Sequence, residues 1–178
     1  MNNKYEITDK TKEWYGRTLH QIKALSDFGD VKTGDLGGWI EKESNLAQEG
    51  NCWVSDDALV FGDALVFGDA RVSDDALVSD DARVSDDALV FGDAWVSDDA
   101  WVRSFHDICW MSSFGSEGRT TTAFRCKDKS IKVNCGCFNG TFEAFEKQVD
   151  KTHGNTHYGK EYKAMIELIK VHFEDLED

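Results

Sequence analysis

The chain has 178 residues and carries 34 acidic against 20 basic side chains, a formal net charge of −14 at pH 7. This charge argues against duplex nucleic acid or an anionic membrane as a direct partner of the chain. No apolar run approaches the roughly 18 residues that span a bilayer, the N-terminus lacks the pattern of a signal peptide, and the irregularly spaced cysteines do not indicate a disulfide framework, so we expect a cytoplasmic protein.

Residues 1–40 are expected to form an N-terminal β-hairpin cap. Residues 17–25 are suited to a strand, and the stretches 27–30 and 34–38 are rich in the glycine and aspartate of tight turns. We expect this cap to lead into a repeated segment at 41–103.

The segment 41–103 contains an unbroken repeat of six residues. Valine recurs at every sixth position from Val54 to Val102, and alanine and aspartate keep the same period in the unit Ala-x-Val-x-(Gly/Asp)-Asp. A short fixed period predicts a solenoid, in which each unit buries its apolar face against its neighbours. A helical array is disfavoured, because a period of six does not match 3.6 residues per turn and the segment is rich in valine.

The same unit predicts the geometry of the coil. Ala and Val are two residues apart, so both side chains point to one face of an extended segment. A polar two-residue corner then turns the chain, and three such sides close a triangular coil of about 18 residues. We therefore expect a mostly β protein built on a short left-handed parallel β-helix of about three coils.

The residue between Ala and Val, and the residue after Val, point outward and are often large and apolar. Such groups would be a liability on the surface of a monomer, so they predict a partner surface. We predict a homotrimer packed along the β-helix, and the alternative is that the terminal segments fold back over one face. The predicted interface consists of Leu59, Phe61, Leu65, Phe67, Leu77, Trp95 and Trp101.

The repeat stops after Val102. Residues 104–118 are expected to form a crossover loop with apolar anchors, and residues 119–178 a ββαα module. Its hairpin would pair 120–126 with 130–138.

Two helices complete the predicted module. Thr141 can N-cap the first, which ends at His153-Gly154-Asn155. The second covers about 158–173, where apolar residues follow helical spacing. Charge is divided between the two parts of the chain, with 14 acidic and 2 basic residues over 46–100, and five basic residues and one acidic residue over 118–135. This asymmetry predicts two surfaces with different roles.

Two groups of motifs carry a family resemblance. Gly37-Gly38-Trp39-Ile40, the stretch 45–54 (Asn-Leu-Ala-Gln-Glu-Gly-Asn-Cys-Trp-Val) and the hexads resemble bacterial and prophage hexapeptide-repeat proteins often labelled "acyltransferase-like". The stretch 135–141 (Cys-Gly-Cys-Phe-Asn-Gly-Thr) and 153–155 look like a tail of phage-encoded β-helix proteins of unassigned role. The resemblance covers most of the chain. It implies the fold and a phage or prophage setting in a bacterial host, where small acidic proteins often blunt host defences, but it says almost nothing about activity.

The basic hairpin suggests a site for an anionic ligand. Arg125 and Lys132 lie on strands expected to pair, and His153 and Tyr158 could add stacking and hydrogen bonds. Basic groups for phosphate with aromatic rings for a base are what nucleotide capture requires. The leading hypothesis is therefore a non-enzymatic, trimeric counter-defence protein that sequesters an anionic ligand such as a nucleotide signal. The alternative is a solvated hairpin whose neighbouring aromatic side chains form the core of the module.

The aspartate ladders at the corners give the second hypothesis, an acidic DNA mimic. Stacked carboxylates could act as a decoy for a host nucleic-acid-binding defence protein, of the anti-CRISPR or anti-restriction type. The Asp directly before each Ala is expected to satisfy backbone N–H groups of the turn. The Asp before it is harder to explain, because Gly replaces it in three hexads. It occurs at positions 56, 74, 80, 86 and 98.

Two further hypotheses are less well supported by the residues. Zinc could be bound by Cys126, Cys135 and Cys137 with His153 and His157, but a helix end separates the two histidines and buried free cysteines are commoner. Acyl transfer, which the resemblance raises, would use a histidine of the coils as a base, yet no hexad contains histidine. We therefore expect neither a metal, nor a cofactor, nor a catalytic residue.

Overall fold

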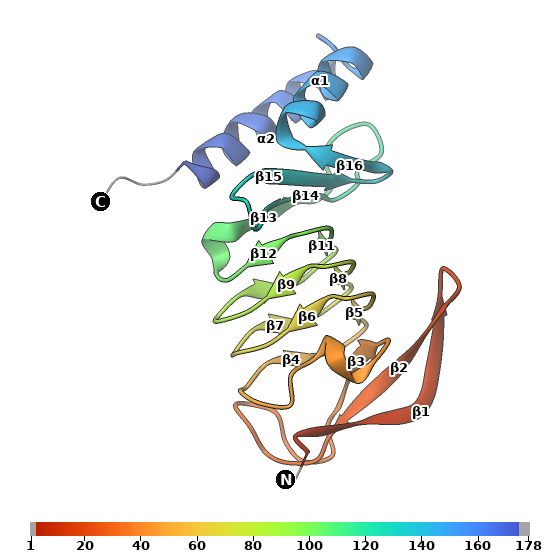
Figure 1. Cartoon of the computed structure of the whole chain (residues 1–178). Helices are drawn as coiled ribbons and strands as arrows, with labels where there is room; N and C mark the ends of the chain where they lie inside the picture. Colours follow the sequence, from red (N-terminus) through yellow and green to blue (C-terminus); the bar gives the residue numbers. More distant parts are fainter. Residues whose placement is uncertain (1–2, 175–178) are drawn as a thin grey trace.

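The computed structural model describes residues 3–174 and has three parts (Figure 1). A stack of short parallel strands forms the centre, an N-terminal hairpin lies at one end, and a sheet with two helices lies at the other. The prediction of a mostly β protein, with a parallel β-helix between an N-terminal β cap and a C-terminal sheet and helix pair, is confirmed. No helix in this range is long and apolar enough to cross a membrane.

The N-terminal hairpin consists of β1 (Tyr5–Trp14) and β2 (Arg17–Ala24), which pair antiparallel. Tyr15 and Gly16 both have positive φ, 45° and 78°, as the tight turns favoured in hairpins require. β2 then pairs with β3 (Leu36–Ile40). The sequence indicated one strand in this region, and the structure adds β1 and β3.

β3 is also the first strand of the β-helix, although we expected it in the cap. It pairs in parallel with β5, Trp39 opposite Leu59. Two glycines make this possible, because a Cβ at Gly37 would lie 2.6 Å from the Val54 carbonyl oxygen and one at Gly38 2.8 Å from that of Ala58. The helix η1 (Glu43–Asn45) then leads into β4 (Trp53–Val54). The β-helix therefore gains an irregular first coil that the hexads do not encode.

The coils form three faces. The first face is β3-β5-β8-β11, the second is β6-β9-β12 and the third is β4-β7-β10. Neighbouring strands pair in parallel with an offset of 18 residues, as in Leu59 opposite Leu77. The remaining strands are β5 (Leu59–Val60), β6 (Leu65–Val66), β7 (Arg71–Val72), β8 (Leu77–Val78), β9 (Arg83–Val84), β10 (Leu89–Val90), β11 (Trp95–Val96) and β12 (Trp101–Val102).

The interior of the coils is filled by the repeated alanines and valines. Every repeat Ala and Val from Val54 to Val102 is at most 1% exposed, as the two-residue spacing predicts. The corners need a residue with positive φ, which Gly62 supplies at 70° and Asp80 at 59°. Glycine adopts this left-handed region freely and aspartate does so more readily than most residues. Backbone conformation therefore explains why Gly and Asp alternate at this position.

The C-terminal sheet has four antiparallel strands rather than two. They are β13 (Ile108–Met111), β14 (Thr121–Arg125), β15 (Ile131–Cys135) and β16 (Phe138–Thr141), in that order. The expected crossover loop at 104–118 thus contains the short helix η2 (Phe105–Asp107) and β13. The sequence hides this strand because both its faces pack on apolar groups. Ile108 and Trp110 face the β-helix core, while Cys109 and Met111 face the helices.

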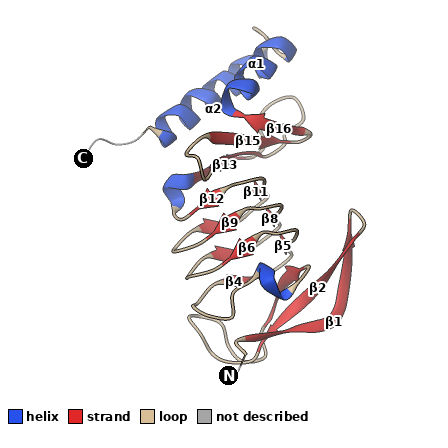
Figure 2. Ribbon diagram, in the orientation of Figure 1, coloured by secondary structure: helices blue, strands red, loops and turns tan. Residues whose placement is uncertain are grey.

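The two helices follow the prediction closely. They are α1 (Phe142–Thr152) and α2 (His157–Phe173). The Thr141 hydroxyl accepts a hydrogen bond from the Ala144 N–H at 3.3 Å, which is the predicted N-cap. The sheet lies between these helices and the last coil (Figure 2), with Phe124 packed on the β-helix and Val133 on the helices.

Candidate binding surface

The N-terminal hairpin covers part of the first face. Leu59 is only 4% exposed and packs against Leu19 and Trp39. Phe61 and Leu77 lie at the edge of this cluster. For these predicted interface residues, the structure shows the alternative arrangement, in which a terminal segment folds back over a face.

Trp95, at the other end of the first face, contacts the C-terminal sheet. Its backbone N–H donates to the Thr122 hydroxyl at 3.1 Å, and its indole N–H donates to the Ser79 hydroxyl at 3.4 Å. Phe67 is half-buried at the corner that follows the second face. The second and third faces of the regular coils leave large apolar side chains exposed, among them Trp101 at 36% and Leu89 at 50%.

A groove of about 810 Å³ runs along the second face. One side is formed by the outward ladder Leu65, Arg83 and Trp101, and the other by corner carboxylates, including Asp81. Residues of η1 and of the β14–β15 turn lie at its two ends. We call this the second-face groove. Its lining residues are Ser44, Asp63, Leu65, Asp81, Arg83, Asp99, Ala100, Trp101 and Lys127.

Where a corner has two aspartates, the two behave differently, and in the reverse of the expected way. The positive-φ Asp is the one that accepts backbone hydrogen bonds, because the Asp74 carboxylate accepts from the Gly92 N–H at 3.0 Å in the next coil. Its neighbours include serine hydroxyls, as in Ser79 to Asp80 at 3.1 Å. These carboxylates help to join successive coils, so the charge that seemed unexplained has a structural role.

The Asp directly before each Ala is the more available charge. At the ends of the ladders it is paired with lysines, Lys12 of the hairpin to Asp57 at 2.9 Å and Lys42 of the first coil to Asp63 at 2.6 Å. These hydrogen bonds hold the pKa values of both carboxyls below the usual range. In the middle of the ladders, four such carboxylates have no hydrogen bond or ion pair with any residue between 3 and 174. They are Asp75, Asp81, Asp87 and Asp93.

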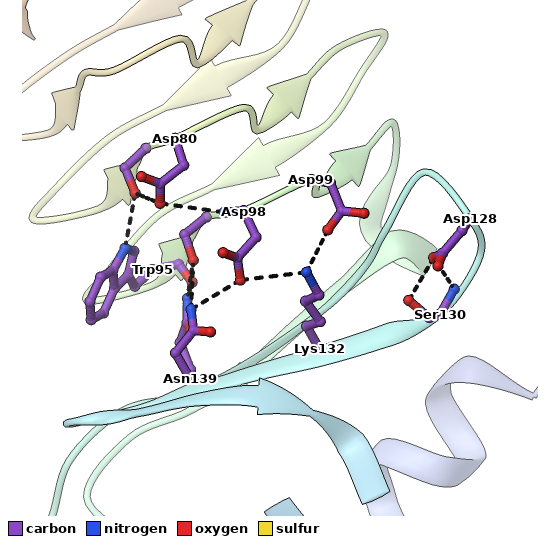
Figure 3. A network of polar contacts seen from close by, with 11 residues as sticks. Asp80, Trp95, Asp98, Asp99, Asp128, Ser130, Lys132 and Asn139 are labelled. Carbon is purple, nitrogen blue, oxygen red and sulfur yellow. Dashed lines mark hydrogen bonds and ion pairs between the residues drawn. The ribbon is translucent and has the colours of Figure 1, made fainter. Parts of the chain in front are cut away.

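Lys132, a predicted ligand residue, joins the sheet to the last coil (Figure 3). Its ammonium lies 2.7 Å from Asp99 and 3.7 Å from Asp98. Asn139 adds a hydrogen bond to Asp98 at 3.1 Å. The hydrogen bond with Asp99 raises the pKa of Lys132 and lowers that of Asp99. Lys132 therefore holds the C-terminal module in place.

Arg125, the other predicted cation, points to the opposite face of the sheet. Across β14 and β15, Arg125 lies opposite Ile131, whereas Lys132 lies opposite Phe124. The Arg125 guanidinium pairs with buried Asp107 at 3.3 Å and lies over the Phe173 ring at 5.5 Å. Because side chains alternate between faces along a strand, the two cations cannot converge on one anion.

The predicted aromatic partners are elsewhere again. The His153 ring stacks on Tyr162, with centroids 5.1 Å apart, beside a small cavity between α1 and the sheet. Tyr158 is 44% exposed and meets the edge of His157. The structure thus does not bring Arg125, Lys132, His153 and Tyr158 into one site.

The cysteines proposed for zinc are also divided between the two faces of the sheet. Cys126 belongs to the β-helix core, where burial and the nearby Asp99 raise the pKa of its thiol to about 12. Cys135 faces the helices and accepts a hydrogen bond from the Thr121 hydroxyl at 3.1 Å. Cys137 is exposed. This separation does not suit a common metal ion, which needs its ligands around one point.

A family match falls on the coils. Residues 82–98, which include β9 to β11, match the YdcK beta solenoid repeat family. A stretch of 38 residues, 21% of the chain, is 63% identical to the uncharacterized acetyltransferase YdcK of Escherichia coli strain K12. The chain spans only 12% of that relative's length, so the similarity supports a hexapeptide-repeat β-helix.

Proposed function

We propose that this chain is a non-catalytic acidic decoy, which presents carboxylates to the nucleic-acid-binding surface of another protein. The observation that carries the proposal is the set of four corner carboxylates without a partner in residues 3–174, at Asp75, Asp81, Asp87 and Asp93. The target that fits this chemistry is a nucleic-acid-binding defence protein of a bacterial host, whose binding surface is basic.

The density of charge on the coils supports a mimic of nucleic acid. Residues 46–100 have a net charge of −12, which becomes −10 when the three paired lysines and the paired Asp30 from outside this range are included. At about 4.8 Å for each stacked strand, three coils rise on the order of 15 Å, so the coils carry about one negative charge per 1.5 Å. B-DNA carries one charge per roughly 1.7 Å of its axis. The two linear charge densities are therefore similar.

The distribution of lysines supports the same proposal. Lys12 comes from the N-terminal hairpin, Lys42 from the irregular first coil and Lys132 from the C-terminal sheet, and all three pair with carboxylates at the ends of the ladders. The middle of the ladders keeps its charge. Within the coils only Arg71 and Arg83 are basic, and Arg71 is itself paired with Asp30.

The test is a triple variant, Asp75→Asn, Asp87→Asn and Asp93→Asn, immobilised and exposed to a bacterial lysate. Asparagine keeps the shape of the side chain, and none of the three carboxylates has a partner to lose among residues 3–174, so the fold should be unchanged. We expect the wild-type chain to retain nucleic-acid-binding proteins that free duplex DNA displaces, and the triple variant to lose them.

The matched control removes three charges outside the coils, through Asp9→Asn, Glu117→Gln and Glu143→Gln, all of them exposed. The control should retain the same proteins as the wild type. Equal retention by the triple variant and the control, or retention that duplex DNA does not compete, would show that the ladder is not a decoy surface.

Capture of an anionic small molecule is the second candidate function, at a site other than the predicted one. A pocket of about 550 Å³ lies where the last coil meets the sheet, and its lining includes Arg103, His106, Arg125 and Lys129. Asp86, Asp87 and Asp107 also line it, and both guanidiniums already bind Asp107. The third basic side chain of the lining is Lys129, on the β14–β15 turn.

Native mass spectrometry of the purified protein tests this candidate. A small anion bound under gentle conditions and released on denaturation supports capture, provided that Lys129→Glu loses it and Lys127→Glu, on the same turn, keeps it. Protein that carries no such mass, or that loses the anion equally in both variants, contradicts it.

A further inference from the structure

The second-face groove contains two charged groups of opposite sign that have no partner within residues 3–174. Arg83 points outward from β9 in the middle of the face, and Asp81 lies two residues earlier at the adjoining corner. No ion pair joins them to each other or to another described side chain. Leu65 lies one coil before Arg83, and Trp101 one coil after it. Half-buried Leu65 and exposed Trp101 therefore flank a cation and an anion that have no partner among the described residues, an arrangement typical of a surface that a protein covers.

The two charges on one copy of the chain can pair with the same two charges on a second copy. Asp81 and Arg83 belong to the same coil and therefore lie at about the same height along the β-helix axis. A rotation axis parallel to the β-helix keeps every coil at its height, so it can place Asp81 of one copy opposite Arg83 of the other. A two-fold axis perpendicular to the β-helix, through this coil and in the plane of the contact, would instead place Arg83 opposite Arg83. Like charges in contact are destabilising, so the charges favour the parallel arrangement.

We propose that the second-face groove binds a second copy of this chain, with the two β-helices side by side and parallel. Arg83 of each copy pairs with Asp81 of its neighbour, and the Leu65 and Trp101 levels pack around this ion pair. The first face cannot serve, because the N-terminal hairpin covers Leu59 and the C-terminal sheet contacts Trp95. The free carboxylates Asp75 and Asp93 lie on the corner opposite the second face, so self-association leaves them available and is independent of the decoy proposal.

The experiment measures the mass of the assembly by native mass spectrometry and by light scattering after gel filtration. We expect the wild type to form a cyclic oligomer, and Arg83→Asp or Asp81→Arg to raise its dissociation constant by at least tenfold. Neither side chain has a partner to lose in the described part of its own chain, so thermal unfolding should be unchanged and loss of assembly would not reflect misfolding. Combining both substitutions in one chain should restore association.

Mixing the two single variants separates contacts between chains from effects within one chain. One variant then carries two acids and the other two bases at these positions, so they should associate with each other although neither does so alone. A dimer would be restored fully, whereas a trimer would be restored only in part, because three copies cannot alternate two kinds of chain. Leu89→Ser on the third face is the control and should leave the mass unchanged. A monomeric wild type, or an oligomer lost in Leu89→Ser but not in Arg83→Asp, would overturn the proposal.

Discussion

Val78→Ala is the most direct test of how the coils are held together. Val78 is completely buried and pairs with Val60 of the coil before it and Val96 of the coil after it. The change removes two buried carbon atoms, which costs about 1.6 kcal/mol in transfer free energy. It leaves a cavity of roughly 50 Å³, which at about 24 cal/mol per Å³ adds about 1.2 kcal/mol. The hydrogen-bonded ladders on both sides keep the coil from collapsing, so the two costs add to about 3 kcal/mol.

Urea denaturation followed by circular dichroism measures this loss. For a chain of this size, 3 kcal/mol corresponds to a fall in Tm of about 6–12 °C. Leu89→Ala is the matched control, since Leu89 is half exposed and its truncation should change the free energy of unfolding by only about 0.5 kcal/mol. A loss below about 1 kcal/mol in Val78→Ala would refute the view that the ladders hold the interior rigid.

Three other outcomes follow from the corners and the sheet. Asp80→Ala should be less stable than Asp80→Gly by about 0.5–1 kcal/mol in the same urea assay, because φ is 59° there and both variants lose the same carboxylate; equal stability would contradict it. The pKa of Asp99 is lowered by Lys132, so this pair stabilises the fold above the unfolded carboxyl pKa near 4 and its contribution is lost as pH falls below that value. The acid-induced fall in Tm should therefore be smaller in Lys132→Met than in the wild type, and an equal fall would count against the pair. Iodoacetamide at pH 8 should modify exposed Cys137 well before Cys126, whose thiol pKa is about 12. Mass spectrometry of the peptides measures the order, and modification of Cys126 first would contradict the prediction.

The repeat made the coils predictable, because each hexad contains all the information for its own side. The same reasoning could not find the first coil. Its strand β3 has no Ala-x-Val unit, and it joins the stack through Gly37 and Gly38, which allow close approach rather than fill the interior. β13 was hidden for another reason. It is apolar on both faces, so it lacks the alternation that reveals a half-buried strand.

A single residue of register separated the two cations of the predicted ligand set. Arg125 and Lys132 do lie on paired strands, but they are offset by one position, and such an offset places side chains on opposite faces. The turn residues between the two strands predicted that the strands pair, but they did not predict which residues lie opposite each other. The free corner carboxylates had a sequence signal, the Asp before each Ala, yet we attributed the structural role to that Asp rather than to its neighbour. The positive φ of the first Asp in each Asp-Asp corner, which the structure shows, distinguishes the structural Asp from the free one.

The coil of 18 residues has a consequence for how the length of this protein can change. Loss or gain of a whole coil would move the C-terminal module along the axis and leave its azimuth unchanged, so that Lys132 would still meet an Asp-Asp or Gly-Asp corner of the same column. Loss of a single hexad would turn the module by a third of a revolution relative to the N-terminal hairpin. The hairpin now packs over the first face, and the β14–β15 turn of the module lies at one end of the second-face groove. A rotated module would place this turn at the end of a different face, so the surroundings of the groove depend on the number of hexads modulo three.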